Sequence, residues 1–210
     1  MVRRRDFLGP WLGALFIAAL VATGLPPGPA RADEFGAGAK KFIEILTSDA
    51  ISMLTVEDIS KTERADRFRR LMNENFAIKG IAKFVLGRHW RKATESEKKE
   101  YLQLFENLLV ATYADRFSSF SGESFEITGV KTGPRETILV NTRINRRNDT
   151  PVAITYVVKR FAGVARIVDV VVEGISMGIT QRAEFASVIR NRGGKVAGLL
   201  TALREKTGKN

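Results

Sequence analysis

The chain has 210 residues, carries a formal net charge of +11, and contains no cysteine and a single histidine, His89. The absence of cysteine excludes disulfides, thiol catalysis and most structural zinc sites. A Ser-His-Asp triad or a histidine-rich metal site would have to be built on His89 alone.

A cleavable export signal is predicted for residues 1–32. Arg4 and Arg5 belong to a basic start, residues 9–24 are mostly apolar, and residues 30–32 (Ala-Arg-Ala) match a small-residue cleavage site. This order is typical of a secretory signal, and the apolar run is short for a membrane span. The arginine pair also fits the twin-arginine export pattern, so that route and the ordinary Sec route both stay open.

The remaining residues, 33–210, have the length of a single domain. They contain no apolar run long enough to span a bilayer, so we expect no integral membrane segment after cleavage. An exported protein rarely meets nucleic acid. The excess of Lys and Arg therefore points to anionic lipid surfaces or acidic protein docking faces as partners.

Apolar side chains spaced three and four residues apart predict several helices. The expected helices cover residues 34–46, 60–73, 76–86, 179–192 and 196–206. Gly87 ends the third of these, and the pair Gly193 and Gly194 separates the last two.

A capping box opens a further, longer helix. Thr94 can accept a hydrogen bond from the backbone N–H of Glu97, whose side chain can reach back to the N–H of Thr94. Beyond this cap, large apolar side chains recur every four residues, with two leucines beside them: Tyr101, Phe105, Leu109, Tyr113 and Phe117, with Leu104 and Leu108. The spacing places this stripe on one side of one helix, where it either packs a core or lines an apolar cavity.

After Gly122 the apolar pattern alternates, which predicts strands over residues 124–131, 137–145, 152–161 and 164–173. Their short connections imply an antiparallel order. The predicted fold class is α+β, a twisted four-stranded antiparallel sheet enclosed by N- and C-terminal helices. The space between sheet and helices is apolar, and it either fills with side chains or keeps a pocket.

Three segments together resemble one protein family. Residues 86–94 read LGRHWRKAT, residues 105–113 read FENLLVATY, and residues 169–176 read DVVVEGIS, followed by Arg182 and Phe185. Their order and spacing are similar to those of the MlaC family, also called the toluene-tolerance family of periplasmic lipid carriers. Two positions depart from the family pattern, since His89 stands where Tyr is usual and Ala165 where Trp is frequent.

The resemblance implies a soluble periplasmic lipid carrier without catalysis, metal or cofactor. It implies a deep apolar pocket for phospholipid acyl chains. It also implies a shuttle between an outer-membrane lipoprotein complex and an inner-membrane ABC transporter complex. With the apolar faces of the predicted elements, it nominates these lipid-binding residues: Phe76, Ile81, Phe84, Val85, Phe105, Leu108, Tyr113, Val140, Ile144, Tyr156, Val170 and Val172. A similar branch, HpnM, is associated with hopanoid biosynthesis, which leaves a hopanoid open as the cargo.

A second class of function, an isomerase or hydrolase for an apolar substrate, is also open. Asp169 lies inside an apolar strand and His89 stands beside Trp90, so either could act as a base. The structural alternative for Asp169 is a pairing with Arg166 or Arg182, or the capping of a neighbouring backbone. The structural alternative for His89 is a packing role.

Basic side chains gather around one predicted hairpin: Arg143, Arg146, Arg147, Lys159 and Arg160. They either contact phosphate head groups or an acidic docking site, or they form a solvated face. A basic face that binds membrane, in a structural periplasmic protein without a pocket, is the third hypothesis.

Overall fold

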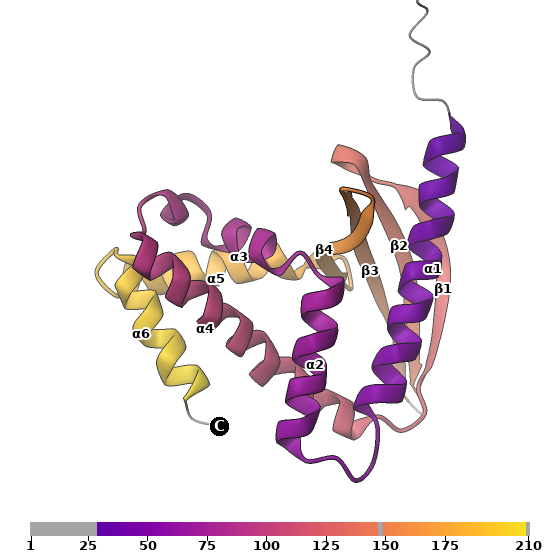
Figure 1. Cartoon of the computed structure of the whole chain (residues 1–210), viewed down its shortest axis with the longest axis horizontal. Coiled ribbons are helices and arrows are strands. Elements are labelled where there is room, and N and C mark those ends of the chain that lie inside the picture. Colours follow the sequence, from indigo (N-terminus) through magenta and orange to yellow (C-terminus); the bar gives the residue numbers. More distant parts are fainter. Residues whose placement is uncertain (1–28, 147–148, 209–210) are drawn as a thin grey trace, which may run out of the picture.

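The computed structural model describes residues 29–146 and 149–208 (Figure 1). Its α-helices are α1 (Pro29–Leu54), α2 (Lys61–Asn75), α3 (Ile78–Leu86), α4 (Glu95–Tyr113), α5 (Met177–Asn191) and α6 (Val196–Thr207). Its strands are β1 (Ser124–Thr132), β2 (Thr137–Arg146), β3 (Asp149–Phe161), β4 (Val164–Val172) and β5 (Ile175–Ser176). Three short 3₁₀ segments are η1 (Gly87–Arg91), η2 (Ala114–Ser119) and η3 (Pro134–Glu136).

Two of the sequence predictions concern residues outside this description. They are the export signal up to residue 28 and Arg147 of the basic hairpin. Among the described residues, none of the helices is both long enough and apolar enough to cross a bilayer.

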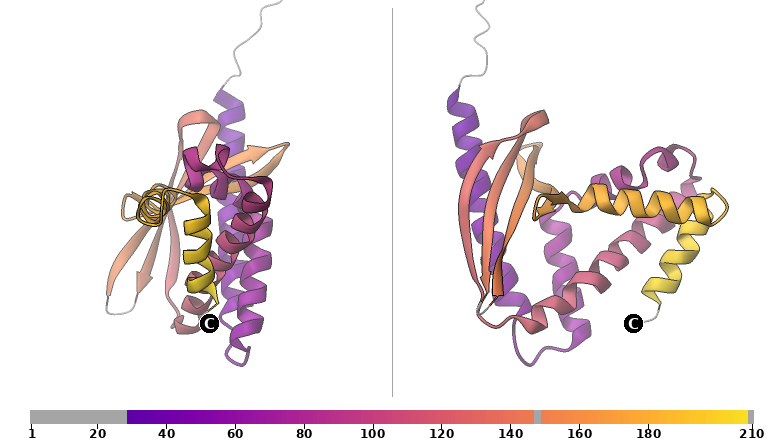
Figure 2. Two further views of the ribbon diagram at one scale, coloured as in Figure 1. Left: turned by 90° about the vertical axis from the view of Figure 1, so that its left-hand side faces the viewer. Right: turned by 180° about the vertical axis from the view of Figure 1, so that it is seen from behind.

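The strands form one antiparallel sheet in chain order, β1-β2-β3-β4-β5. Helices from both ends of the chain flank this sheet, which confirms the α+β class (Figures 1 and 2). The predicted count of four strands is wrong, because the chain turns back after β4 and adds the short β5. Glu173 and Gly174 make this turn with φ values of 50° and 79°. A strand of two residues is too short to produce an alternating apolar pattern.

The helix α1 lies along one face of the sheet (Figure 2). It extends well beyond the predicted end at residue 46, because apolar positions continue at helical spacing as far as Leu54. Ala39, Ile43 and Leu54 are fully buried and Leu46 is nearly so. The helix thus buries one continuous stripe from Ala39 to Leu54.

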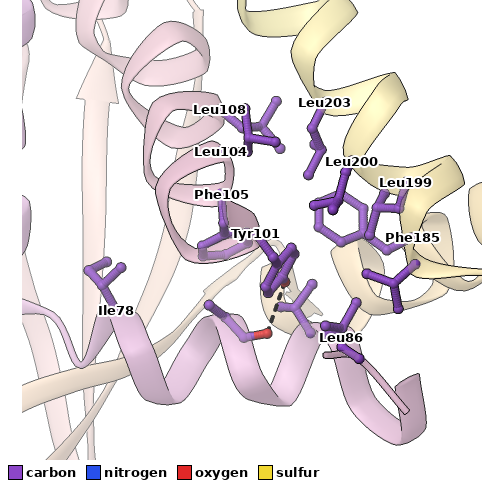
Figure 3. Close-up of a cluster of buried hydrophobic side chains, with 14 of the residues drawn as sticks. Ile78, Leu86, Tyr101, Leu104, Phe105, Leu108, Phe185, Leu199, Leu200 and Leu203 are labelled. Atoms are coloured by element: carbon purple, nitrogen blue, oxygen red, sulfur yellow. Dashed lines mark hydrogen bonds between the residues drawn. The ribbon is translucent and has the colours of Figure 1, made fainter. Parts of the chain in front are cut away.

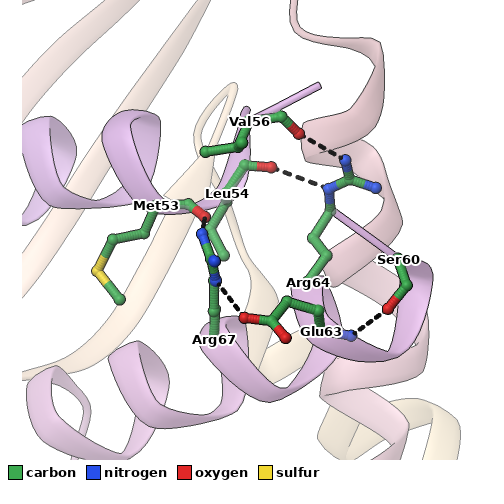
Figure 4. A network of polar contacts seen from close by, with 7 residues as sticks. All are labelled: Met53, Leu54, Val56, Ser60, Glu63, Arg64 and Arg67. Carbon is green, nitrogen blue, oxygen red and sulfur yellow. Dashed lines mark hydrogen bonds and ion pairs between the residues drawn. The ribbon is translucent and has the colours of Figure 1, made fainter. Parts of the chain in front are cut away.

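Two arginines of α2 hold the end of α1 (Figure 4). The last carbonyl groups of a helix lack partners within the helix. The buried side chain of Arg64 donates from Nε to the carbonyl oxygen of Leu54 at 2.9 Å and from Nη2 to that of Val56 at 3.2 Å. Arg67 donates from Nη1 to the carbonyl oxygen of Met53 at 3.0 Å. These bonds fix α2 against α1.

The predicted capping box opens α4. Thr94 Oγ1 accepts from the N–H of Glu97 at 3.2 Å, and Glu97 Oε2 accepts from the N–H of Thr94 at 2.9 Å. The prediction that the stripe continues on one helix as far as Phe117 is wrong, because α4 stops at Tyr113 and η2 follows. A 3₁₀ segment has about three residues per turn, which rotates Phe117 out of the four-residue row. Its ring instead lies 6.0 Å from the ring of Phe68 on α2.

Buried side chains form two clusters. The helical core, in part drawn in Figure 3, joins α3, η1, α4, α5 and α6, with Ala82, Val85, Leu86, Tyr101, Leu104, Phe105, Leu108, Phe185, Ile189, Leu199, Leu200 and Leu203 among its members. The sheet core joins α1, α2 and the sheet through Ala39, Ile43, Leu46, Leu71, Ile138, Val140, Val158 and Ile167. Phe76 packs against both clusters.

Candidate functional site

The first half of the α4 stripe fills the helical core. Tyr101 and Phe105 are fully buried, their ring centroids are 5.8 Å apart, and each ring lies 6.2 Å from that of Phe185. The Tyr101 hydroxyl donates to the carbonyl oxygen of Ala82 at 2.9 Å, and burial raises the pKa of Tyr101 (Figure 3). Leu108 is buried in the same cluster. Of the residues expected near a ligand, Phe105 and Leu108 therefore also hold the helices together.

The second half of the stripe is less buried. Leu109 packs against the edge of the helical core. Tyr113, also an expected ligand contact, is half-buried at the end of α4, with the guanidinium of Arg116 lying 5.2 Å from its ring centroid. The first half of the stripe therefore packs the helical core, whereas its second half is only partly buried.

The candidate residues of the sheet share one face. Val140 pairs with Tyr156, which pairs with Val170, so these three form a row across β2, β3 and β4. Ile144 and Val172 lie further along the same face, because alternate residues of a strand point to the same side. Val140 is fully buried in the sheet core, and burial raises the pKa of Tyr156 to about 12. Ile144 and Val172 are half-buried.

Phe76 stands where the two cores meet. It forms an isolated β-bridge with Ile167 of β4, and the N–H of Ala77 donates to the carbonyl oxygen of Ile167 at 2.9 Å. On the helical side of this junction, Val85 is fully buried and Ile81 is partly buried against the helical core. The candidate residues therefore divide between the sheet face and the helical core, with Phe76 between them.

Phe84 is separate from the other candidates. It lies on α3, is 45% exposed, and has the guanidinium of Arg182 at 5.1 Å from its ring centroid. The structure does not bring it together with the sheet face.

Two hollows are present on the described surface. The first, of about 520 Å³, is lined by Gly80, Lys83, Phe84, Gly87, Arg88, Trp90, Arg91 and Arg182. The second, of about 310 Å³, is lined by Gly36, Ala37, Lys40, Val130, Lys131, Thr132 and Ile138. Of the predicted lipid-binding residues, only Phe84 lines either of these two hollows. A pocket between sheet and helices stays a prediction.

The helix α1 covers the candidate sheet face, although no residue of α1 was nominated from the sequence. Its residues Ala39, Ile43 and Leu46 belong to the sheet core. Their spacing of four and three residues was the available signal. The spacing of a helical stripe, however, does not indicate which other element the helix packs against.

Asp169 joins β4 to the start of α5. Its Oδ1 accepts from the N–H of Gly178 at 3.0 Å and from that of Val170 at 2.9 Å, and its Oδ2 accepts from the Ser176 hydroxyl at 2.5 Å. Ser176 in turn caps α5 by accepting from the N–H of Ile179 at 3.1 Å. Asp169 thus takes the capping role that was one of its two structural alternatives.

The expected pairing of Asp169 with an arginine is wrong. Arg166 donates to the carbonyl oxygen of Ala165 at 3.0 Å, and Arg182 lies over the Phe84 ring. The Ser176 hydroxyl and the N–H groups of Val170 and Gly178 supply the carboxylate with three hydrogen bonds instead.

His89 is buried in η1 at 8% exposure, and its Nε2 has no hydrogen-bond partner within the described chain. Burial lowers the pKa of His89, and the neighbouring charges of Arg88 and Lys92 lower it further. The lowered pKa favours the neutral ring, and the burial of His89 agrees with a packing role. Residues 29–146 and 149–208 hold no group of three His, Asp or Glu side chains that could bind a metal ion.

Known proteins resemble this chain in sequence and in fold. The family model described as MlaC protein matches residues 44–205. The toluene tolerance protein Ttg2D of Pseudomonas putida is 20% identical over 129 residues, which is 61% of this chain, and the chain spans 60% of that relative. A solved structure of the phospholipid-binding protein from Ralstonia solanacearum, in complex with a phospholipid, is similar with a TM-score of 0.73 at 20% identity. This likeness covers 81% of this chain and 97% of the other, and it establishes a shared fold.

Proposed function

The chain belongs to the MlaC protein family, and from that premise we propose that it is a periplasmic lipid carrier. The cargo is a phospholipid, whose acyl chains lie between the sheet face and the helices. The carrier exchanges this lipid between complexes of the outer and inner membranes, of which the inner one is an ABC transporter.

Support for this proposal comes mainly from the shared fold. The chain covers 97% of a protein whose solved structure holds a phospholipid. In the present chain, the row of Val140, Tyr156 and Val170 supplies an apolar surface on the sheet, and Phe76 joins this surface to the helices. Such a surface can bind hydrocarbon.

The energetics of acyl chains explain why such a carrier hands its cargo directly to other proteins. Burying one CH₂ group contributes about 0.8 kcal/mol, so two acyl chains with about thirty CH₂ groups correspond to roughly 20 kcal/mol of gross transfer free energy. The bilayer offers the lipid nearly the same stabilisation. Release into water would forfeit most of this term, whereas exchange with another protein or a bilayer would not.

A hopanoid is the second candidate for the cargo. Ala165 of β4 is partly buried against the sheet core, at a position where the family frequently has Trp. The missing ring leaves room for a broader, polycyclic lipid.

Native mass spectrometry of the exported protein, purified without detergent, tests the proposal. We expect a bound species in the phospholipid mass range, and a hopanoid mass would select the second candidate. A protein that is empty, and that also fails to take up labelled phospholipid, would contradict both.

Val172 and Val171 provide a matched pair of variants for locating the lipid. Both are half-buried on β4, but they point to opposite faces of the sheet. We expect Val172→Glu to abolish lipid uptake, because a carboxylate against an acyl chain is strongly unfavourable. Val171→Glu should retain uptake. An equal loss of lipid uptake in both variants, with circular dichroism unchanged, would contradict lipid binding at this face.

A further inference from the structure

The hollow on α3, η1 and α5 has an unusual charge. Six side chains that define it are Lys83, Phe84, Arg88, Trp90, Arg91 and Arg182. Four of these are cationic, two are aromatic, and the lining contains no Asp or Glu. We refer to these six residues as the cationic hollow.

The four cations are not neutralised within the described chain, where none of them forms an ion pair with a carboxylate. Other arginines of this protein do have such partners. Arg69 pairs with Glu106 at 2.8 Å, and Arg192 pairs with Glu205 at 2.8 Å. Other cations of the described chain, such as Lys41 and Arg70, also form no ion pair. What distinguishes this surface is that four such cations line one hollow whose lining contains no carboxylate.

Aromatic rings hold two of the cations in place. The guanidinium of Arg182 lies 5.1 Å from the ring centroid of Phe84, and Nζ of Lys83 lies 5.9 Å from that of Trp90. Gly87, at φ 57°, lets Arg182 approach α3, since a Cβ at this position would lie 3.0 Å from its guanidinium. Arg182 of α5 is thus positioned across the end of α3.

Phe84 adds an apolar element to this charged surface. Phe84 is 45% exposed and is one of several large apolar side chains that the fold leaves exposed. Cations beside an exposed aromatic ring are typical of surfaces that bind at a bilayer interface. At such a surface the cations meet the lipid phosphates and the exposed ring of Phe84 can enter the layer beneath them, whereas Trp90 is partly buried against the helical core.

We propose that the cationic hollow docks the protein on a bilayer that carries anionic lipid head groups. This docking is separate from the carriage of lipid between sheet and helices. Each Lys or Arg near an anionic surface strengthens binding by about fivefold. Because the contact is electrostatic and exposed, binding is reversible and weakens as the ionic strength rises.

Trp90 supplies a reporter inside the hollow. The sequence contains one other tryptophan, Trp11, which lies in the predicted export signal. We would mix the exported protein with vesicles of brominated phosphatidylcholine alone, or of brominated phosphatidylcholine with an equal part of phosphatidylglycerol. Anionic vesicles should bind the protein and quench Trp90, and neutral vesicles should do neither.

The double variant Arg88→Gln with Arg91→Gln should weaken binding to anionic vesicles by about 25-fold, because it removes two charges. A matched control, Lys41→Gln with Lys206→Gln, removes two exposed charges from α1 and α6 and should change binding by less than about twofold. Both variants should keep their co-purified lipid, which separates this inference from the proposed carrier function.

Four results would overturn the inference. One is equal binding to neutral vesicles, and another is no binding to anionic vesicles at low salt. A third is an equal loss of binding in the control variant, since net charge alone would then explain the effect. The fourth is that polyglutamate alters Trp90 fluorescence while anionic vesicles do not, because the hollow would then be a docking site for an acidic protein.

Discussion

At the scale of single residues, the surroundings decide what a titratable group does. Asp169 and His89 were the two candidates for a catalytic base. The carboxylate of Asp169 accepts bonds from the start of α5, and the imidazole of His89 is buried with Nε2 unpartnered in the described chain. Both side chains thus serve the packing and joining of elements.

His89 predicts how the stability of the protein depends on pH. Burial and the charges of Arg88 and Lys92 lower its pKa below the usual 6.5. As the pH falls below 6.5, the unfolded chain therefore takes up the proton before the folded protein does. The stabilisation is full above pH 6.5 and is lost as the pH falls towards the lowered pKa.

We expect His89→Phe to retain more stability than the parent protein in acid. Urea denaturation at neutral pH and at about pH 5, below the ordinary pKa of histidine, measures the difference. The unfolding free energy of the variant minus that of the parent should increase as the pH falls. A difference that stays constant would mean that His89 does not titrate in this way.

At the scale of elements, helix ends determine how the helices pack. The capping box starts α4 at Glu95, after Thr94, and the change to 3₁₀ geometry ends the helix at Tyr113. The end of α1 is held from outside the helix, by side chains of α2. Figure 4 shows Arg64 and Arg67 reaching carbonyl groups at and just beyond the end of α1.

Substitution of Arg64 tests this connection. Arg64→Leu leaves the carbonyl groups of Leu54 and Val56 without their donor, and we expect a loss of about 2 kcal/mol of unfolding free energy. Arg70→Leu, an exposed change on the same helix, should stay within about 0.5 kcal/mol. Urea denaturation gives both values. Faster hydrogen exchange at the end of α1 should appear in the first variant only.

At the scale of the whole molecule, two cores meet at one junction. The helical core and the sheet core are distinct clusters, and Phe76 packs against both. Figure 2 shows α5 and α6 extending away from the sheet, so much of the helical core is remote from it. A lipid bound between sheet and helices would add contacts across this junction.

Bound lipid should therefore stabilise the folded protein. A ligand that binds only the folded state, at a hundred times its Kd, adds about 2.7 kcal/mol to the unfolding free energy. We expect lipid-loaded protein to unfold at a higher temperature than protein stripped of lipid, as measured by calorimetry. In Val172→Glu the two preparations should unfold together. Identical transitions in the parent protein would contradict binding across the junction.

Local patterns in the sequence sufficed for most elements of the fold. The Thr94 and Glu97 pair predicted the start of α4, and alternation predicted β1 to β4. Two features were not predicted. β5 has only two residues, which is too short for an alternating pattern, and the apolar spacing of α1 continues past residue 46 to Leu54, although the predicted helix ended at 46.

The sequence by itself determined the helices, the antiparallel strands and the family, since these depend on spacing and on residue type along the chain. Only the tertiary structure decided the use of each apolar face. Tyr101 and Phe105 lie in the helical core, and Phe84 is exposed beside Arg182. Asp169 accepts hydrogen bonds from the start of α5. The reason is that burial and pairing depend on which surfaces meet, and residues far apart in the chain determine those contacts.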